Sequence, residues 1–413
     1  MATILCGYCL PVGALAQDAA ASSTGAPMPP PSSPSPFATA GAWSFTGIAN
    51  ADILSNAAGG IHQAVKGLSK FALAAAYDGS QDDHDGLSGL ASVQFVKGGR
   101  VSAHAVGDVQ GLDNIEAAGA LRLYEAWLSR EYDAARGWKV GLIDLNVDFD
   151  TQEVGSLFLN SSDGIGPELG HSGLNGPSIY PTTALGVTGF VRAGPGLTVR
   201  AGMFDGTAGN PAHSGRFAIR LSSRDGVLAI AQVEQQSDRG LRLEGGAWTY
   251  SAYFDALHRV DAQGSPRRYQ RSRGAYALIE GPLLKTGGDD ERGLSGWIRV
   301  GLADPLVQNI FGYLGGGIVY GGPLASRAED QLGLAINHAI VETDDLDLRS
   351  KKRSETAVEL TYRYLANDWL AIQPDMQLIV HPAGRFPTAL VVGVRVSVTL
   401  TKNLAAKIKD ATN

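Results

Sequence analysis

The sequence predicts an all-β protein in which one continuous antiparallel sheet closes into a transmembrane β-barrel. Three observations predict this fold: segments with alternating apolar and polar residues recur along the chain, glycine makes up 53 of the 413 residues, and only 18% of the residues are charged. Alternation with a period of two is typical of a strand with two unlike faces, and glycine permits tight turns and bends. The chain contains no uninterrupted apolar run of about 18 residues, the length that a membrane helix requires.

The clearest strand pattern covers residues 388–400. The even-numbered residues from Leu390 to Leu400 are aliphatic, whereas Arg395 lies on the opposite, more polar face. Residues 355–365 and 369–381 repeat the pattern. Counting such segments between residues 43 and 400 gives about eighteen candidate strands, separated by turns rich in Gly, Asp and Pro.

Alternation alone does not distinguish a membrane barrel from a water-soluble sandwich, because the two share a period and differ in which face lies inside. Three features favour the barrel. The polar faces carry Arg, Glu, Asp and Gln of mixed sign, as a wet lumen would, and an export signal begins the chain. Aromatic residues such as Trp248, Tyr250, Tyr253 and Trp369 lie at predicted strand ends, as in an interfacial girdle.

The first part of the chain has the pattern of a secretory signal peptide. A largely apolar stretch ends in Ala14-Leu15-Ala16, a small-x-small cleavage pattern, and both cysteines, Cys6 and Cys9, precede it. The Pro-, Ser- and Ala-rich stretch that follows is expected to be extended and flexible. The expected organisation is a removed signal peptide, a flexible segment, one barrel domain and a polar C-terminal tail, at residues 1–16, 17–40, 41–400 and 401–413.

Composition and motifs exclude several other classes. The absence of cysteine after Cys9 excludes a disulfide scaffold and Cys-ligated metal from the body of the chain. A net charge of −7 without a long basic run argues against nucleic acid as a partner. Asp144-x-Asn146-x-Asp148 is similar to the start of a calcium loop but lacks the later glycine and acid, so these residues are expected to form one polar stripe on a strand. We expect no metal, no cofactor and no enzymatic activity, since no catalytic spacing stands out among the serines and histidines.

Parity along the predicted strands selects residues that face the lumen. The segment from Val147 to Tyr180 has weak strand character and is expected to fold into the lumen as a constriction. Of the arginines, Arg200, Arg242 and Arg363 are preferred for solute contact; for each candidate the alternative role is a wall ion pair. The candidates for the solute path are Arg200, Arg242, Arg299, Arg363, Arg395, Glu125, Trp127, Asp144, Asn146, Glu359, Asp375 and Gln377.

Several stretches in order along the chain carry a family resemblance. They are RLYEAWL at 122–128, GLIDLNVDF at 141–149, AGMFDG at 201–206, ELTYR at 359–363 and QPDMQ at 373–377. Together they resemble the OprB-type carbohydrate-selective porins of Gram-negative outer membranes, over roughly residues 47–400. The resemblance implies a 16-stranded barrel, so that two of the eighteen candidates would belong to loops.

The resemblance further implies passive, sugar-preferring diffusion of small hydrophilic solutes into the periplasm. The expected partners are outer-membrane lipid, neutral sugars and the barrel-assembly machinery, and the expected state is a monomer. Arginine forks, carboxylates and aromatic rings suit a neutral polyhydroxylated solute, provided that each contact is weak enough to release it. Three alternatives are open: the same barrel for organic acids or aromatic compounds, a secreted soluble glycan-binding β protein, and a barrel enzyme.

Overall fold

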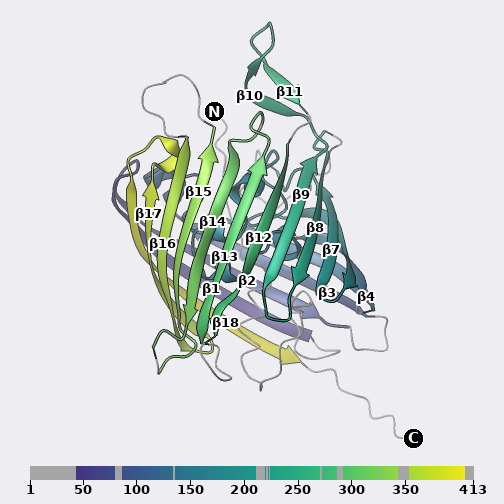
Figure 1. Cartoon of the computed structure of the whole chain (residues 1–413), viewed down its shortest axis with the longest axis vertical. Coiled ribbons are helices and arrows are strands. Elements are labelled where there is room, and N and C mark those ends of the chain that lie inside the picture. Colours follow the sequence, from purple (N-terminus) through teal and green to yellow (C-terminus); the bar gives the residue numbers. More distant parts are fainter. Residues whose placement is uncertain are drawn as a thin grey trace, which may run out of the picture.

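A computed structural model describes residues 43–79, 86–133, 135–210, 219, 222, 224–269, 272–285, 292–324, 326–342 and 353–404. Within them, sixteen strands form one closed antiparallel barrel in which each strand pairs with its neighbours in sequence and β1 pairs with β18 (Figure 1). The expected signal peptide and flexible segment, residues 1–16 and 17–40, lie outside the described residues. The predicted fold class is therefore confirmed.

The first eight barrel strands are β1 (Trp43–Ala58), β2 (Ala64–Tyr77), β3 (Leu87–Gly98), β4 (Ala120–Asp133), β5 (Arg136–Ile143), β6 (Ala184–Gly194), β7 (Leu197–Asp205) and β8 (Val227–Gln236). The remaining eight are β9 (Arg242–Tyr250), β12 (Arg273–Lys285), β13 (Gly293–Ala303), β14 (Ile310–Gly321), β15 (Gln331–Val341), β16 (Ser354–Asn367), β17 (Leu370–Val380) and β18 (Ala389–Leu404). β10 (Phe254–Val260) and β11 (Pro266–Tyr269) form a separate hairpin that stands above the barrel rim (Figure 1).

The two faces of the wall have opposite character. On β18, Val392 and Val396 point outward and are exposed, whereas Arg395 between them points into the lumen and is buried. On β17, Met376 is exposed and the alternate residue Asp375 is buried. An apolar exterior around a polar interior is the arrangement of a membrane barrel, and the period-two prediction for these strands is confirmed.

The two ends of the barrel differ in the length of their connections. At one end, where the start of β1 pairs with the end of β18, β6 and β7 are joined by residues 195–196 and β16 and β17 by residues 368–369. At the other end, β5 and β6 are joined by residues 144–183 and β9 and β12 by residues 251–272. Outer-membrane barrels carry short turns on the periplasmic side and longer loops outside, so the hairpin of β10 and β11 faces the exterior.

Two long connections fold into the barrel. The first inward segment, residues 99–119, contains the helix η1 (Ser102–Val106). The second inward segment, residues 144–183, confirms the predicted lumen loop. It contains α2 (Leu145–Asp148), η2 (Val154–Leu157), η3 (Ser161–Asp163) and α3 (Pro167–Gly170), and a further short helix, η5 (Pro382–Gly384), precedes β18. No helix among the described residues is long and apolar enough to cross a membrane.

The expected count is confirmed, since sixteen of the eighteen strands of the described residues form the barrel and two form the hairpin outside its wall. Three other expectations require correction. β5 ends at Ile143, so the stripe expected on a strand from Asp144 onward lies in the second inward segment. β18 continues past the predicted end at Leu400 to Leu404. Trp248 and Tyr250 do not belong to an interfacial girdle, because both are buried inside the barrel, where inward segments cover strands β9 and β12.

Candidate functional site

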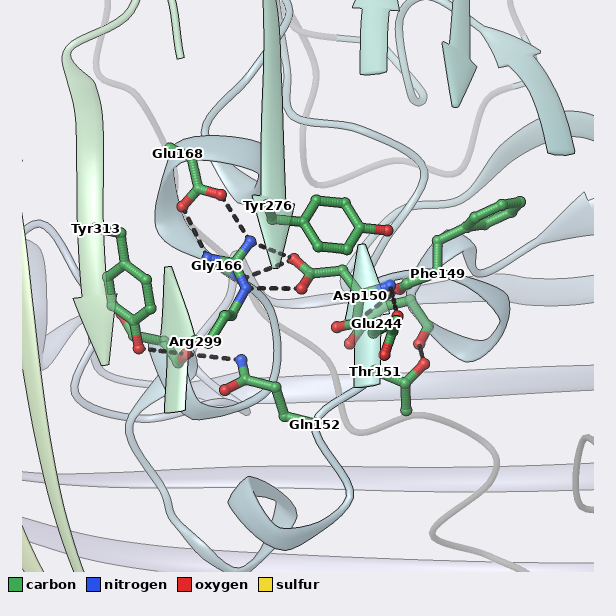
Figure 2. Close-up of polar contacts among 12 residues, drawn as sticks. Phe149, Asp150, Thr151, Gln152, Gly166, Glu168, Glu244, Tyr276, Arg299 and Tyr313 are labelled. Atoms are coloured by element: carbon green, nitrogen blue, oxygen red, sulfur yellow. Dashed lines mark hydrogen bonds and ion pairs between the residues drawn. The ribbon is translucent and has the colours of Figure 1, made fainter. Parts of the chain in front are cut away.

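Arg299 is one of the wall residues that anchor the second inward segment. Arg299 of β13 donates from Nε and Nη2 to the two carboxylate oxygens of Asp150, both at 2.7 Å, and from Nη1 and Nη2 to Glu168 at 3.1 and 2.6 Å. Tyr276 and Tyr313 flank the guanidinium, each with its ring centroid 5.3 Å away (Figure 2). All three charged side chains of this cluster have no exposed surface, so Arg299 holds the segment and does not meet the solute.

Two glycines permit this close approach. A Cβ atom at Gly166 of the segment would lie 2.0 Å from the guanidinium carbon of Arg299, and one at Gly301 of β13 would lie 2.0 Å from Glu168 Oε1. Real Cβ atoms never make such contacts, and the crowding atoms are pinned by four hydrogen bonds. The local sequence therefore places glycine where the segment and the wall touch.

Arg242 of β9 lies at the centre of a second, more acidic cluster. Its guanidinium donates to Glu280 of β12, with Nε 2.9 Å from Oε1, and to Glu244 at 2.7 Å. Glu234 of β8 lies 3.5 Å away, and Glu153 of the inward segment lies 3.9 Å away. Arg242 is almost fully buried, whereas the Glu153 side chain is 44% exposed. One cation thus faces four carboxylates, and the exposed member gives the adjacent lumen a negative potential.

Glutamates on the wall hold both segments by their backbones. Glu359 of β16 accepts from Leu159 N at 2.7 Å and from Asn160 N at 2.8 Å. Glu280 and Glu355 do the same, and the amides that bond to them are Glu153 N, Val154 N, Val109 N, Gln110 N and Ala383 N. Such charge-assisted bonds satisfy loop amides that would otherwise be buried without partners. Glu359, which parity predicted to face the lumen, therefore acts as a loop anchor, as do Glu280 and Glu355.

The first inward segment is also anchored at Leu112 and Asp113, by side chains of β17 and β18. Arg395 donates to Asp52 of β1, with Nη2 2.6 Å from Oδ2, and to Asp113 of the segment at 3.0 Å. Gln377 of β17 donates to Leu112 O at 2.7 Å, and its Nε2 also lies 3.1 Å from Asp375 Oδ1. Three of the predicted candidates, Arg395, Asp375 and Gln377, thus meet at one anchor.

A carboxylate inside this segment makes its anchoring sensitive to pH. Glu116 Oε2 accepts from Val101 N and Ser102 N, both at 3.0 Å. Burial raises the pKa of Glu116 to about 7; the two amide bonds oppose this shift and the nearby Asp108 carboxylate adds to it. The pKa of Glu116 in the folded protein lies above the ordinary value. The contribution of protonated Glu116 to the stability of the fold is therefore complete below about pH 4.5 and is lost as the pH rises to about 7.

We expect hydrogen exchange of the peptide that contains Val101 and Ser102 to accelerate from pH 4.5 to pH 7 after correction for the intrinsic rate. The full effect corresponds to roughly 3 kcal/mol of local opening free energy. Glu116→Gln keeps the acceptor but not the titration, so its exchange should lose most of this pH dependence. An unchanged pH profile in Glu116→Gln would contradict the assignment.

Asp144, the first residue of the stripe from Asp144 to Asp148, caps the short helix α2. Asp144 Oδ1 accepts from Asn146 N at 2.9 Å at the start of α2, and its other oxygen accepts from the Tyr124 hydroxyl. Asn146 Nδ2 donates to Asp150 O at 2.8 Å. This is the geometry of an Asx cap. Both residues are buried, so they shape the segment and are remote from solute.

An aromatic and basic group lies on the part of the wall that carries fewer segment anchors. Phe190 and Arg192 of β6 face the lumen, and so does Arg200, the β7 partner of Phe190. The guanidinium carbons of Arg192 and Arg200 lie 4.8 and 5.8 Å from the Phe190 ring centroid. Opposite the ring on β5 is Gly137, where a Cβ atom would lie 2.8 Å from Phe190 Cε1. We call Phe190, Arg192 and Arg200 the Phe190 strip; all three are half-buried.

A second half-buried aromatic lies two strands away. Trp127 of β4 donates from Nε1 to Glu125 Oε1 at 3.1 Å, and Lys139 Nζ of β5 lies 5.0 Å from its ring centroid. Lys139 also pairs with Asp148 of the second inward segment at 2.9 Å. Lys139 thus links the wall, the segment and the tryptophan face.

The twelve predicted lumen residues divide into two groups. Arg200, Trp127 and Arg363 are half-buried and border the open lumen. The buried group, whose members anchor an inward segment or belong to one, consists of Arg242, Arg299, Arg395, Glu125, Asp144, Asn146, Glu359, Asp375 and Gln377. Sequence reasoning missed Phe190, Lys139 and the whole first inward segment. For Phe190 a signal existed, because it shares the parity of Arg192 and is flanked by the outward residues Val187 and Val191.

A closed barrel with an apolar exterior, a polar lumen and loops that narrow this lumen defines an outer-membrane diffusion channel. Residues 47–400 match the family described as carbohydrate-selective porin, OprB family, and the chain belongs to that family. The resemblance stated from the sequence is confirmed, as is the location in the outer membrane. The family and the fold are those of a channel and not those of an enzyme.

Two known proteins, one of them in two structures, are similar to this chain. Porin B of Pseudomonas aeruginosa strain PAO1 is 24% identical over 311 residues, which cover 67% of this chain and 67% of that protein. The high-pH structure of Pseudomonas putida OprB has 19% identity and a TM-score of 0.76, covering 87% of this chain and 94% of that chain. The low-pH structure of the same protein has 16% identity and a TM-score of 0.54, covering 87% of this chain and 93% of that chain. Both structures share the barrel fold.

Proposed function

We propose that neutral sugars cross this outer-membrane channel along the Phe190 strip. The observation that carries the proposal is a half-buried aromatic ring with two half-buried arginines beside it on the lumen face of β6 and β7. The apolar face of a pyranose stacks on an aromatic ring, and the arginine forks donate to hydroxyl groups. Each contact is weak, which a conducting channel requires.

Acceptors lie one step along the same wall. In the sheet register Phe190, Arg200 and Gln232 form one row, and Arg192, Thr198 and Glu234 form the next. The Arg242 cluster with the exposed Glu153 adjoins this second row. Gln232, Thr198 and Glu234 are buried, so the Phe190 strip offers the solute donors and a ring, and the accessible acceptor beside it is Glu153. Juxtaposed charges of both signs favour a neutral dipolar solute over an ion.

The remaining accessible candidates extend the path. Trp127 offers a second ring, and Arg363 lies on the lumen face of β16 near its short turn to β17. We propose that Trp127 and Arg363 make further weak contacts with the solute before and after it passes the Phe190 strip. We also propose a working monomer, inserted by the barrel-assembly machinery after cleavage of residues 1–16.

Liposome swelling with solutes of matched size tests the proposal. Neutral monosaccharides should enter faster than amino acids, organic acids and aromatic acids. Equal rates at equal size would refute sugar preference, and faster entry of an organic or aromatic acid would assign the barrel to that solute class.

Phe190→Leu should weaken sugar block of the single-channel current roughly fivefold, for a lost contact of about 1 kcal/mol. Leucine keeps an apolar side chain but has no ring face. Arg200→Lys keeps the charge but loses the fork, and should have a similar effect; Arg363→Ala should have a smaller one. Salt conductance should change little in each variant.

The matched control is Val191→Ala, which alters an outward residue beside the strip. Its sugar block should equal that of the unmodified chain. If Phe190→Leu and Val191→Ala behave alike, sugars do not use the Phe190 strip.

A further inference from the structure

A groove of about 1080 Å³ lies on the outer wall of the barrel, away from the lumen. It runs over β8, β9 and β12 toward the end of β13, at the barrel end that carries the hairpin of β10 and β11 (Figure 1). The solute pathway described above does not include this groove, and its occupant is independent of which solute crosses the lumen.

The floor of the groove is apolar because its outward side chains are small. Ala231, Ala247 and Ala275 lie side by side in the register of β8, β9 and β12. On β13 the same row continues with Leu302, which is 67% exposed and forms one wall. Apolar surface open to the hydrocarbon phase and hollowed in this way fits a flexible acyl chain.

The rim of the groove is polar and basic. Arg259 of β10 and Tyr269 of β11 overhang it, and Arg273 begins β12 beside it. The Arg273 side chain is 60% exposed, with Asp304 Oδ2 at 3.9 Å from its Nε. The hairpin is fixed in this position, since Leu257 N donates to Leu306 O at 3.0 Å. An apolar floor below an arginine-bearing rim is the complement of a phosphorylated amphiphile.

The topology places this rim at the outer leaflet of the outer membrane. We propose that the groove binds lipid A, the phosphorylated and multiply acylated glycolipid of that leaflet. One acyl chain lies over the alanine row, and a phosphate is held by Arg259 and Arg273. A second copy of the chain is the competing occupant. The basic rim favours the lipid, because two copies would bring the same arginines together.

Native mass spectrometry of the delipidated full-length barrel, titrated with purified lipid A, tests the proposal. We expect one tightly bound lipid A per barrel. Ala247→Trp, which fills the floor, and the double variant Arg259→Ser/Arg273→Ser should each weaken binding about tenfold. Ala51→Trp, at an exposed outward alanine of β1, is the matched control and should bind as the unmodified chain does.

Two further measurements decide between occupants. Lipid A without its phosphates should bind the unmodified barrel about as weakly as lipid A binds the double-arginine variant. The proposal is overturned if Ala247→Trp and Ala51→Trp bind lipid A with equal affinity. It is also overturned if the unmodified barrel binds lipid A equally well with and without its phosphates. An oligomer that dissociates in Ala247→Trp without lipid present also overturns it and assigns the groove to a second copy. Retained heat-modifiable gel mobility shows that each variant is folded.

Discussion

Arg299→Ala is expected to increase single-channel conductance and to lower the temperature at which the barrel loses its folded gel mobility. The substitution leaves Asp150 and Glu168 buried without their cation. Removing one partner of a buried ion pair typically costs about 3–5 kcal/mol, because the remaining charge is uncompensated. The second inward segment can relieve that cost by leaving the wall, which widens the lumen.

A triple variant separates the lost charge balance from the lost packing. Arg299→Met with Asp150→Asn and Glu168→Gln removes the cation and both anions together. Replacing a whole buried ion pair by neutral groups is far less costly than breaking it, so this variant should recover much of the stability. Arg200→Ala, at a half-buried wall arginine, is the matched control and should leave stability near that of the unmodified chain. Normal conductance and normal thermal stability in Arg299→Ala would show that Arg299 does not hold the segment.

The wall of this barrel and one of its two inward segments were predictable from the sequence, whereas the contacts between those segments and the wall were not. Strand parity placed Arg299, Glu359 and Arg395 on the lumen face correctly, because side-chain direction alternates strictly along a strand. Parity does not say what else occupies the lumen. The inward segments cover these residues and turn them from solute contacts into anchors, and residue spacing carries no information on such long-range packing.

The stretch after Ile143 shows why the local structure of an inward segment is hard to predict from the sequence. Asp144, Asn146 and Asp148 alternate with apolar residues as a strand would, yet they form the cap and first turn of a helix. A run of four to seven residues is too short for its period to distinguish the two structures. Phe190 is not among the predicted residues, most of which are charged. Its signal in the sequence is an aromatic residue at the parity of Arg192, on the lumen face of β6.

Arg242→Ala is expected to make the channel more selective for cations. Four carboxylates surround Arg242, and one of them, Glu153, is exposed to the lumen. Without the guanidinium the carboxylates of the cluster lose their counter-charge beside the path. The reversal potential under a KCl gradient, measured in planar bilayers, should shift toward the potassium equilibrium potential. Stability should fall by about 3–5 kcal/mol, as for other broken buried pairs.

Charge and shape at this site can be tested separately. Arg242→Ala with Glu244→Gln and Glu280→Gln removes two of the anions along with the cation. The reversal potential of this variant should therefore return most of the way to that of the unmodified chain. Arg242→Lys keeps the cation but cannot donate to Glu244 and Glu280 as a fork, so selectivity should hold while stability falls.

The two arginine clusters therefore predict different signatures. Arg299 is sealed between the segment and the wall, so its loss should raise conductance with little change in ion preference. Arg242 adjoins the exposed Glu153, so its loss should alter ion preference even where the segment stays in place. An Arg242→Ala channel with unchanged reversal potential would mean that permeating ions pass beyond the influence of Glu153, and the path would then have to lie closer to Trp127 and Lys139.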